Sequence, residues 1–257
     1  MIESEFLKSQ TTVEDESKRY GYRGRIGFIA PGSTIETIPI EFYKIAPRGV
    51  TIVFVGIGIK RLTKEDIEES LKGIEQAASE LARTKADVII LGGSPPVISG
   101  GFGFDRKIIQ RIGTVTDIPA TTSQTLAVEA MKGLGIKNLV VASPFGENQN
   151  VLLRKFLQDS GFVVHGIKGL NMERIDYGSL PRDASYKIAK EVCKDVKDFD
   201  GIYLPCAQMP TMEIIDRLEK ELGKPVVTSV QAMIWGALRI LKVSDPVEGY
   251  GRLFKIA

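Results

Sequence analysis

Cysteine and histidine, the residues from which disulfide frameworks and many metal sites are built, are scarce in this sequence. Its 257 residues include two cysteines, Cys193 and Cys206, and one histidine, His165. Two cysteines are too few for a disulfide framework, and a single histidine cannot form a multi-histidine metal cluster. Metal-dependent hydrolysis is therefore disfavoured, and we expect no metal site.

Long apolar runs and an excess of charge of one sign are also missing. No apolar run approaches the ~20 residues of a membrane span, and residues 1–6 are acidic and polar where a secretory signal would begin with basic residues. With 34 Lys and Arg against 32 Asp and Glu, the net charge of +2 leaves no extended basic field. We expect a cytoplasmic protein whose partners include neither nucleic acid nor a membrane.

The sequence does contain the pattern of an α/β protein. Residues 1–24 are rich in charge, Ser and Thr and predict a polar N-terminal tail, whereas short apolar runs and segments of helical period, such as 65–83, alternate from residue 25 onward. Short runs with little polar alternation are typical of strands covered on both faces, so we expect parallel sheets. The runs are 26–30, 51–57, 87–91, 138–142, 162–167, 201–204 and 225–228.

An internal duplication divides this pattern into two similar halves. Pro144 follows Pro31 by 113 positions, and Cys206 follows Gly93 by the same 113, each pair at the end of a predicted strand. A third pair of strands, each followed by a helix, covers 118–123 and 224–229. Strand ends of unrelated α/β proteins also look alike, but three pairs in one order favour a true repeat.

We therefore expect two α/β halves related by a pseudo-twofold axis, with the active site in the cleft between them. The first half covers 25–125, with a terminal helix that can cross over, and the second covers 126–257. Ligands of open parallel sheets bind outside the carboxyl ends of the strands. The predicted site is therefore built from four loops, namely 31–35, 92–96, 144–148 and 205–210.

Cys206 is the candidate catalytic residue. It follows a predicted buried strand and precedes a helix predicted over 211–222, whose N-terminal dipole would favour a thiolate. A thiol there can serve as acid, base or nucleophile, and the alternative is a small buried apolar residue. Cys193, in the middle of a predicted helix, and His165, in an apolar strand, are interpreted as structural.

Glycines and hydroxyl residues at the strand ends suggest anion binding. The Gly-Gly-Ser sequence 92–94 can cradle an anion with backbone N–H groups, or form a plain turn. The hydroxyl residues at strand ends are neutral donors for a carboxylate, or helix N-caps. A dinucleotide motif at 56–58 lacks its third glycine, because position 61 is Arg. The hydroxyl residues are Ser33, Thr34, Ser94, Thr122, Ser123, Thr228 and Ser229.

These residues resemble the aspartate/glutamate racemase superfamily, and within it the branch of arylmalonate decarboxylase and maleate cis-trans isomerase. The resemblance covers 25–254 and is carried by the stretches 200–211, 223–235 and 249–254. It implies catalysis without a cofactor, by two cysteines that face each other across the substrate carbon. Here Gly93 takes the place of the first, as in the decarboxylases, and Cys206 matches the second.

The resemblance also implies the substrate-binding residues. Hydroxyl residues after the glycine, the amide after the cysteine and a tyrosine in the third loop bind the carboxylate, and Ser94, Pro95, Ala207 and Phe145 stand at those positions. Pro95 has neither hydroxyl nor N–H, and Phe145 cannot donate a hydrogen bond, so this oxyanion site is poorer. The remaining predicted binding residues are Pro31, Gly32, Ser33, Gly93 and Gln208.

The favoured function is a carbon–carbon lyase that decarboxylates a small malonate-like diacid. A two-base racemase needs a competent group on both faces of the carbon, which Gly93 cannot supply, whereas a decarboxylase needs one proton donor. The alternatives are a racemase or isomerase that recruits Ser94 or Ser33, and a catalytically weak carboxylate-binding protein. The expected partner is a small carboxylate or dicarboxylate, and assembly into a homo-oligomer is left open.

Overall fold

Two four-stranded parallel sheets form the framework of the protein in a computed structural model that describes residues 18–256. The strand order is β2-β1-β3-β4 in one sheet and β6-β5-β7-β8 in the other. The two orders are the same, which confirms the α/β fold with two similar halves. The strands are β1 (Gly24–Ala30), β2 (Val50–Gly56), β3 (Val88–Leu91), β4 (Ala120–Thr122), β5 (Asn138–Ser143), β6 (Val163–Gly169), β7 (Gly201–Leu204) and β8 (Val226–Thr228).

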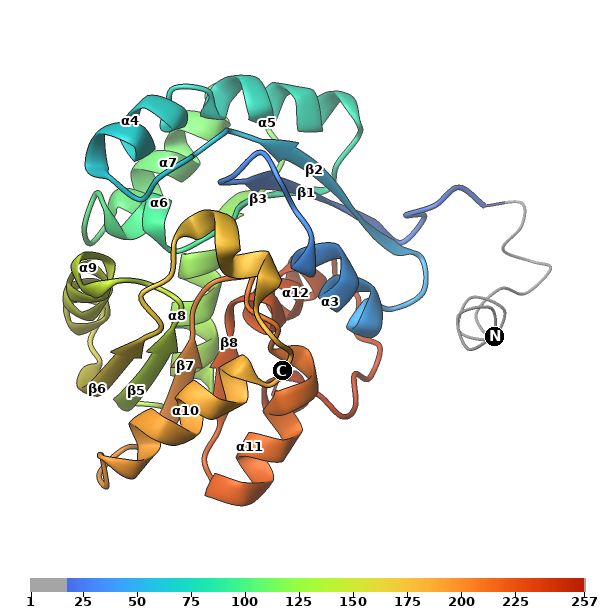
Figure 1. Cartoon of the computed structure of the whole chain (residues 1–257). Helices are drawn as coiled ribbons and strands as arrows, with labels where there is room; N and C mark the ends of the chain where they lie inside the picture. The colour runs from blue at the N-terminus through green and yellow to red at the C-terminus, as the bar shows by residue number, and fades with distance from the viewer. Residues whose placement is uncertain (1–17, 257) are drawn as a thin grey trace.

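The inner strands β3 and β7 are buried along their whole length, as expected for strands with helices on both faces. Figure 1 shows α4 to α7 around the first sheet and α9 to α11 beside the second. The helices are α3 (Thr37–Ile45), α4 (Lys64–Leu71), α5 (Ile74–Arg83), α6 (Pro95–Ile98), α7 (Phe104–Gly113), α8 (Ser123–Gly133), α9 (Glu147–Asp159), α10 (Ala184–Lys194), α11 (Ile215–Leu222) and α12 (Ser229–Ile240). Three 3₁₀ turns are η1 (Arg174–Ser179), η2 (Met212–Ile214) and η3 (Leu253–Lys255).

Helices α8 and α12, which follow the last strand of each sheet, pack against each other between the halves. Each begins with a threonine N-cap: Thr122 accepts from the N–H of Thr125, and Thr228 from that of Gln231. Thr228 belongs to a capping box, in which the Gln231 side chain also accepts from the Thr228 N–H. For these two hydroxyls, the N-cap interpretation of the sequence is the one that the structure shows.

Two predicted helices differ from the structure. The segment 65–83 forms two helices, α4 and α5, that break at Gly73, where a glycine lowers helix propensity. The segment 211–222 starts with the turn η2, and its α-helix begins only at Ile215. The Glu41 carboxylate accepts from the N–H groups of Thr211 and Met212 at the start of this turn.

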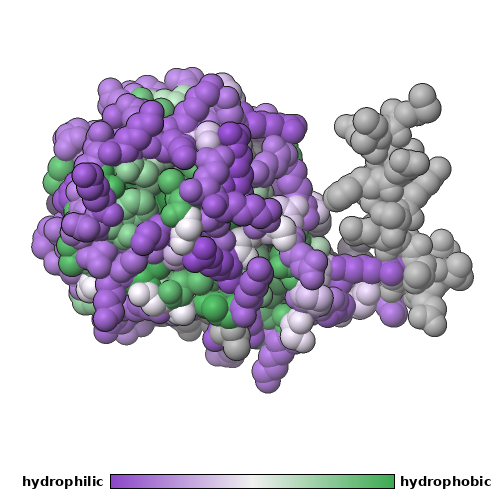
Figure 2. Space-filling view, turned by 90° about the horizontal axis from the view of Figure 1, so that it is seen from below, coloured by the Kyte–Doolittle hydropathy of each residue, from purple (hydrophilic) through white to green (hydrophobic). Residues whose placement is uncertain are grey.

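The predicted tail at 1–24 lies outside the described residues up to residue 17, and the division at 125 remains a prediction. No helix of the part that is described is long and apolar enough to cross a bilayer. Hydrophilic residues cover most of the face shown in Figure 2, and the apolar areas between them are small. Assembly into an oligomer also remains a prediction.

Candidate active site

A small cavity lies at the carboxyl ends of the inner strands, where loops from both halves meet. Its volume is about 60 Å³, and its wall is mainly apolar. By the space that one buried water needs, this volume holds on the order of four to six waters, which suits a small acid. The lining residues are Phe28, Ala30, Pro31, Gly32, Thr34, Ile35, Ile38, Leu62, Gly93, Pro95, Phe145, Arg174, Tyr177, Cys206, Ala207 and Gln208.

Most of the predicted site residues line this cavity, but two serines do not. Ser33 is exposed, and Ser94 is buried behind the cavity wall with its Oγ 3.5 Å from the hydroxyl of Tyr203. That hydroxyl donates to Oε1 of Gln124 at 3.1 Å. The predicted residues that line the cavity are Pro31, Gly32, Gly93, Pro95, Phe145, Cys206, Ala207 and Gln208. What each of them does remains a prediction.

Cys206 and Gly93 share an unusual backbone conformation. Their φ angles are 83° and 77°, both in the left-handed region. Glycine adopts this conformation freely, but a residue with a Cβ does so at a cost of about 1–2 kcal/mol. Among residues 18–256 only three other non-glycine residues have positive φ: Lys85, Asn171 and Lys242. A cysteine in a strained position of a cavity wall is a feature typical of a functional site.

Burial at Cys206 favours the protonated thiol over the thiolate. Burial raises its pKa to about 12, although the backbone N–H groups of Gln208 and Met209 and the charge of Arg174 oppose the rise. The structure gives no support to the expectation that a helix N-terminus favours a thiolate at Cys206. The physical reason is that α11 begins nine residues after Cys206 and does not direct its first amides at the sulfur. A neutral thiol suits the role of proton donor.

Two cavity residues, Arg174 and Tyr177, were not singled out in the sequence. Both belong to η1, in the connection between β6 and α10. The guanidinium lies so close to Gly32 that a Cβ there would stand 2.2 Å from Nη1. The expectation of neutral donors alone is therefore incomplete. The available signal was the length of this connection, because long loops at the strand ends of α/β proteins often carry function.

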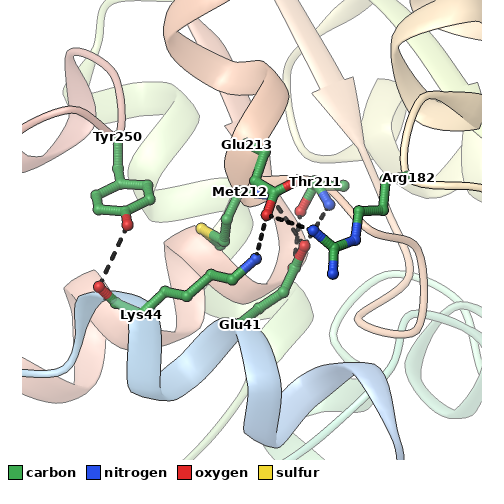
Figure 3. A network of polar contacts seen from close by, with 7 residues as sticks. All are labelled: Glu41, Lys44, Arg182, Thr211, Met212, Glu213 and Tyr250. Atoms are coloured by element: carbon green, nitrogen blue, oxygen red, sulfur yellow. Dashed lines mark hydrogen bonds and ion pairs between the residues drawn. The ribbon is translucent and has the colours of Figure 1, made fainter. Parts of the chain in front are cut away.

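A second, charged cavity of about 170 Å³ is lined by residues of α3 and of the loop that follows Cys206. Its wall includes Glu41, whose carboxylate also accepts from the Thr211 hydroxyl at 3.1 Å (Figure 3). Burial raises the pKa of Glu41 to about 7, against the opposing effect of these hydrogen bonds and of Lys44. Lys44 and Arg182 both contact Glu213 in the same network. Glu41 thus fixes the loop that follows Cys206 from the other half of the protein.

The remaining candidates lie elsewhere. Cys193 is half-buried on α10, and burial raises its pKa to about 11. His165 is exposed on β6, with Nε2 2.9 Å from Oδ1 of Asn138. Neither lines the cavity. Between residues 18 and 256, no three His, Cys, Asp or Glu side chains are placed to hold a metal ion.

The structure is that of an α/β protein with two similar halves and a cysteine in the cavity where their loops meet. Comparison with known families agrees with this description. The family model described as arylmalonate decarboxylase matches residues 26–254, and the chain belongs to this family. The resemblance stated from the sequence is confirmed.

Relatives that the chain resembles in sequence include two kinds of enzyme. The chain is 26% identical to the arylmalonate decarboxylase of Bordetella bronchiseptica over 236 residues, which cover 89% of this chain and 95% of that protein. It is also 26% identical to the maleate isomerase of Pseudomonas putida over 247 residues, which cover 89% and 96%. In fold it resembles a liganded double mutant of arylmalonate decarboxylase, with a TM-score of 0.84, 24% identity and coverage of 90% and 98%. The relatives support an enzyme and leave both activities open.

Proposed function

We propose that the protein is a decarboxylase of a small malonate-like dicarboxylic acid, with Cys206 as the proton donor. The observation that supports this most directly is that one thiol, the buried Cys206, lines a mainly apolar cavity that also contains Gly93. Decarboxylation needs one proton donor, whereas a two-base reaction needs a second group on the other face of the carbon. Gly93 provides no such group.

In the proposed reaction the bond between the α-carbon and one carboxylate breaks, and CO₂ leaves. The electron pair of that bond passes to the α-carbon and the remaining carboxylate, which becomes an enediolate. The thiol of Cys206 then protonates the α-carbon from one face, and the resulting thiolate regains a proton from solvent. No cofactor takes part in these steps.

The apolar part of the cavity supports the first of these steps. Ile35, Ile38 and Leu62 are lining residues that offer no hydrogen bond from their side chains to a leaving carboxylate. A carboxylate that loses hydration without gaining a partner is destabilised relative to neutral CO₂. The cavity therefore favours a substrate with one unpaired carboxylate.

The second candidate is a cis-trans isomerase, because maleate isomerase is as similar in sequence as the decarboxylase. A weak carboxylate-binding protein is the third, because Pro95 and Phe145 stand where donors are expected. A panel of 2-substituted malonates and maleate separates the three candidates. We expect CO₂ release from at least one malonate and no conversion of maleate to fumarate.

The matched variants are Cys206→Ala and Cys193→Ala. Loss of a general acid lowers turnover by about 10²- to 10⁴-fold, so Cys206→Ala should show this loss while Cys193→Ala stays within a few fold. Fumarate formation without CO₂ would replace the proposal with an isomerase. Binding without any turnover would replace it with a binding protein.

A further inference from the structure

We propose that Arg174 and Tyr177 of η1 form a carboxylate-binding pair that holds the carboxylate remaining on the substrate. The pair would take over the role of the donors that are missing at Pro95 and Phe145. Which carboxylate it binds rests on the proposed decarboxylation, whereas the presence of an anion site does not. A site of this kind would select substrates that retain one carboxylate from the start to the end of the reaction.

Arg174 supplies the charge of this site. It is the one charged side chain among the residues that line the cavity. Its Nε donates to the carbonyl of Lys60 at 3.3 Å, and no carboxylate of residues 18–256 pairs with its guanidinium. Arginine offers several donors in a planar fork that matches a carboxylate. A guanidinium without a carboxylate partner, in a cavity beside a thiol, is suited to an anionic ligand.

Tyr177 supplies a second donor. The residue is 3% exposed, and its hydroxyl has no hydrogen-bond partner within the described part of the protein. Burying a hydroxyl without a partner costs free energy, so such a group commonly awaits a ligand or a water. Burial also raises the pKa of Tyr177, and the phenol therefore keeps its proton and can donate to an anion.

The local fold brings these two residues together. In a 3₁₀ turn the side chains at positions i and i+3 lie on the same face, which is the spacing of Arg174 and Tyr177. The Tyr177 ring also packs against Phe145, with ring centroids 6.1 Å apart. The phenol of Tyr177 therefore lies beside Phe145, the residue at which the resemblance implies a tyrosine. The cavity thus has a phenol in this region although position 145 does not supply it.

The chemistry indicates which carboxylate the pair binds. A cation on the leaving carboxylate would stabilise the ground state and slow the loss of CO₂. On the remaining carboxylate, the same cation and donor meet a charge that increases as the enediolate forms, and they stabilise the transition state more than the substrate. The apolar residues Ile35, Ile38 and Leu62 are left for the group that departs.

The test compares the affinity of acids with that of their uncharged amides, and so does not depend on turnover. The probes are 2-phenylpropanoate with 2-phenylpropanamide, and isobutyrate with isobutyramide, measured by calorimetry. The wild type should prefer each acid by about 10- to 100-fold, the value of hydrogen bonds to a charged group. Arg174→Met should remove the preference, and Tyr177→Phe should reduce it. Arg182→Met and Tyr43→Phe, exposed controls of the same chemistry, should retain it.

A second variant moves the guanidinium without removing its charge. In Gly32→Ala the new Cβ would lie 2.2 Å from Nη1, and the arginine must leave its place. The acid preference should fall, and the double variant with Arg174→Met should be no worse than Arg174→Met alone. Gly113→Ala, whose Cβ would meet nothing within 4 Å, is the control.

The outcomes separate this inference from the proposed function. A folded wild type that binds acid and amide equally, or binds neither acid, overturns the carboxylate pair. An acid preference that survives Arg174→Met also overturns it. If instead the preference depends on Arg174 but no malonate releases CO₂, the pair stands and the proposed decarboxylation fails.

Discussion

The loops that carry Gly93 and Cys206 occupy equivalent places in the two halves and differ in one respect that matters for chemistry. Both follow the inner strand of a sheet by two residues, and both backbones are left-handed at this position. In the first half the residue has no side chain, and in the second it carries a thiol in a conformation that favours glycine. The two halves therefore share a backbone conformation at this position, but only the second half carries a reactive side chain there.

The surroundings of Gly93 leave little room for a side chain. A Cβ built on this residue would stand 2.7 Å from Cγ of Pro31, closer than real Cβ contacts. The space that a second thiol would need is therefore partly filled by the neighbouring loop. A thiol at position 93 therefore also requires a shift or a substitution of Pro31.

Cys206→Gly makes the two loops alike and should produce the largest effect. Turnover should be lost to the same extent as in Cys206→Ala, about 10²- to 10⁴-fold, because both variants lack the proton donor. The glycine variant should nevertheless be more stable than the alanine variant by about 1 kcal/mol, since glycine relieves the left-handed strain. CO₂ release and urea unfolding measure the two effects. Equal stability of the two variants would show that position 206 is not strained.

Gly93→Cys makes the loops alike in the opposite direction. The backbone conformation already matches that of Cys206, but the contact with Pro31 should destabilise the variant by about 1–3 kcal/mol. The second thiol should allow proton exchange at both faces of the α-carbon of a chiral 2-substituted monoacid. Deuterium incorporation in D₂O, followed for both enantiomers, measures this gain.

The control for Gly93→Cys is its combination with Pro31→Ala, which should recover part of the lost stability by opening space at the new Cβ. A labelling reagent that reacts with the new thiol, and from which substrate protects it, shows that the group is in the cavity. Unchanged exchange at a single face in such a labelled protein would contradict the expected two-sided chemistry.

The difference between the loops of Gly93 and Cys206 could be predicted from the sequence. The side chains that reach these loops from distant segments of the chain could not. Strand ends can be recognised from short apolar runs, and the common spacing then pairs Gly93 with Cys206. Arg174 and Glu41 lie in segments without a recognisable motif, and they reach the site only because η1 and α3 cross to the other half. The effect of burial on the pKa of Cys206 has the same origin, since burial depends on packing that the sequence does not specify locally.

Glu41, which bonds the loop after Cys206 from the other half, should give the protein a pH-dependent stability. Its pKa is about 7 in the folded protein against 4.5 ordinarily. Between these values the folded state holds a proton that the unfolded state has lost, so stability falls as pH rises from 4.5 to 7, by about 3 kcal/mol for this group. Urea unfolding across this range measures the fall.

Glu41→Gln is the matched variant, because its amide oxygen can still accept from the backbone of Thr211 and Met212. The variant should lack this part of the pH dependence. Glu129 and Glu219 also have raised pKa values, so the wild type and the variant must be compared at each pH. An unchanged difference in stability between them from pH 4.5 to 7 would refute the assignment.

The helix caps give the smallest and most symmetric comparison of the halves. Thr122→Ala and Thr228→Ala each remove an N-cap, at a cost of about 1 kcal/mol. Each hydroxyl also has a second hydroxyl partner, Thr125 at 2.8 Å from Thr122 and Thr211 at 3.2 Å from Thr228. The loss should be larger at Thr228, because its cap alone is reciprocal, with Gln231. The two serine substitutions keep the hydroxyl and should retain most of the stability. Urea unfolding at one pH ranks the four variants. A larger loss at Thr122 would contradict this ranking and would show that the reciprocal bond of Gln231 adds little to the cap at Thr228.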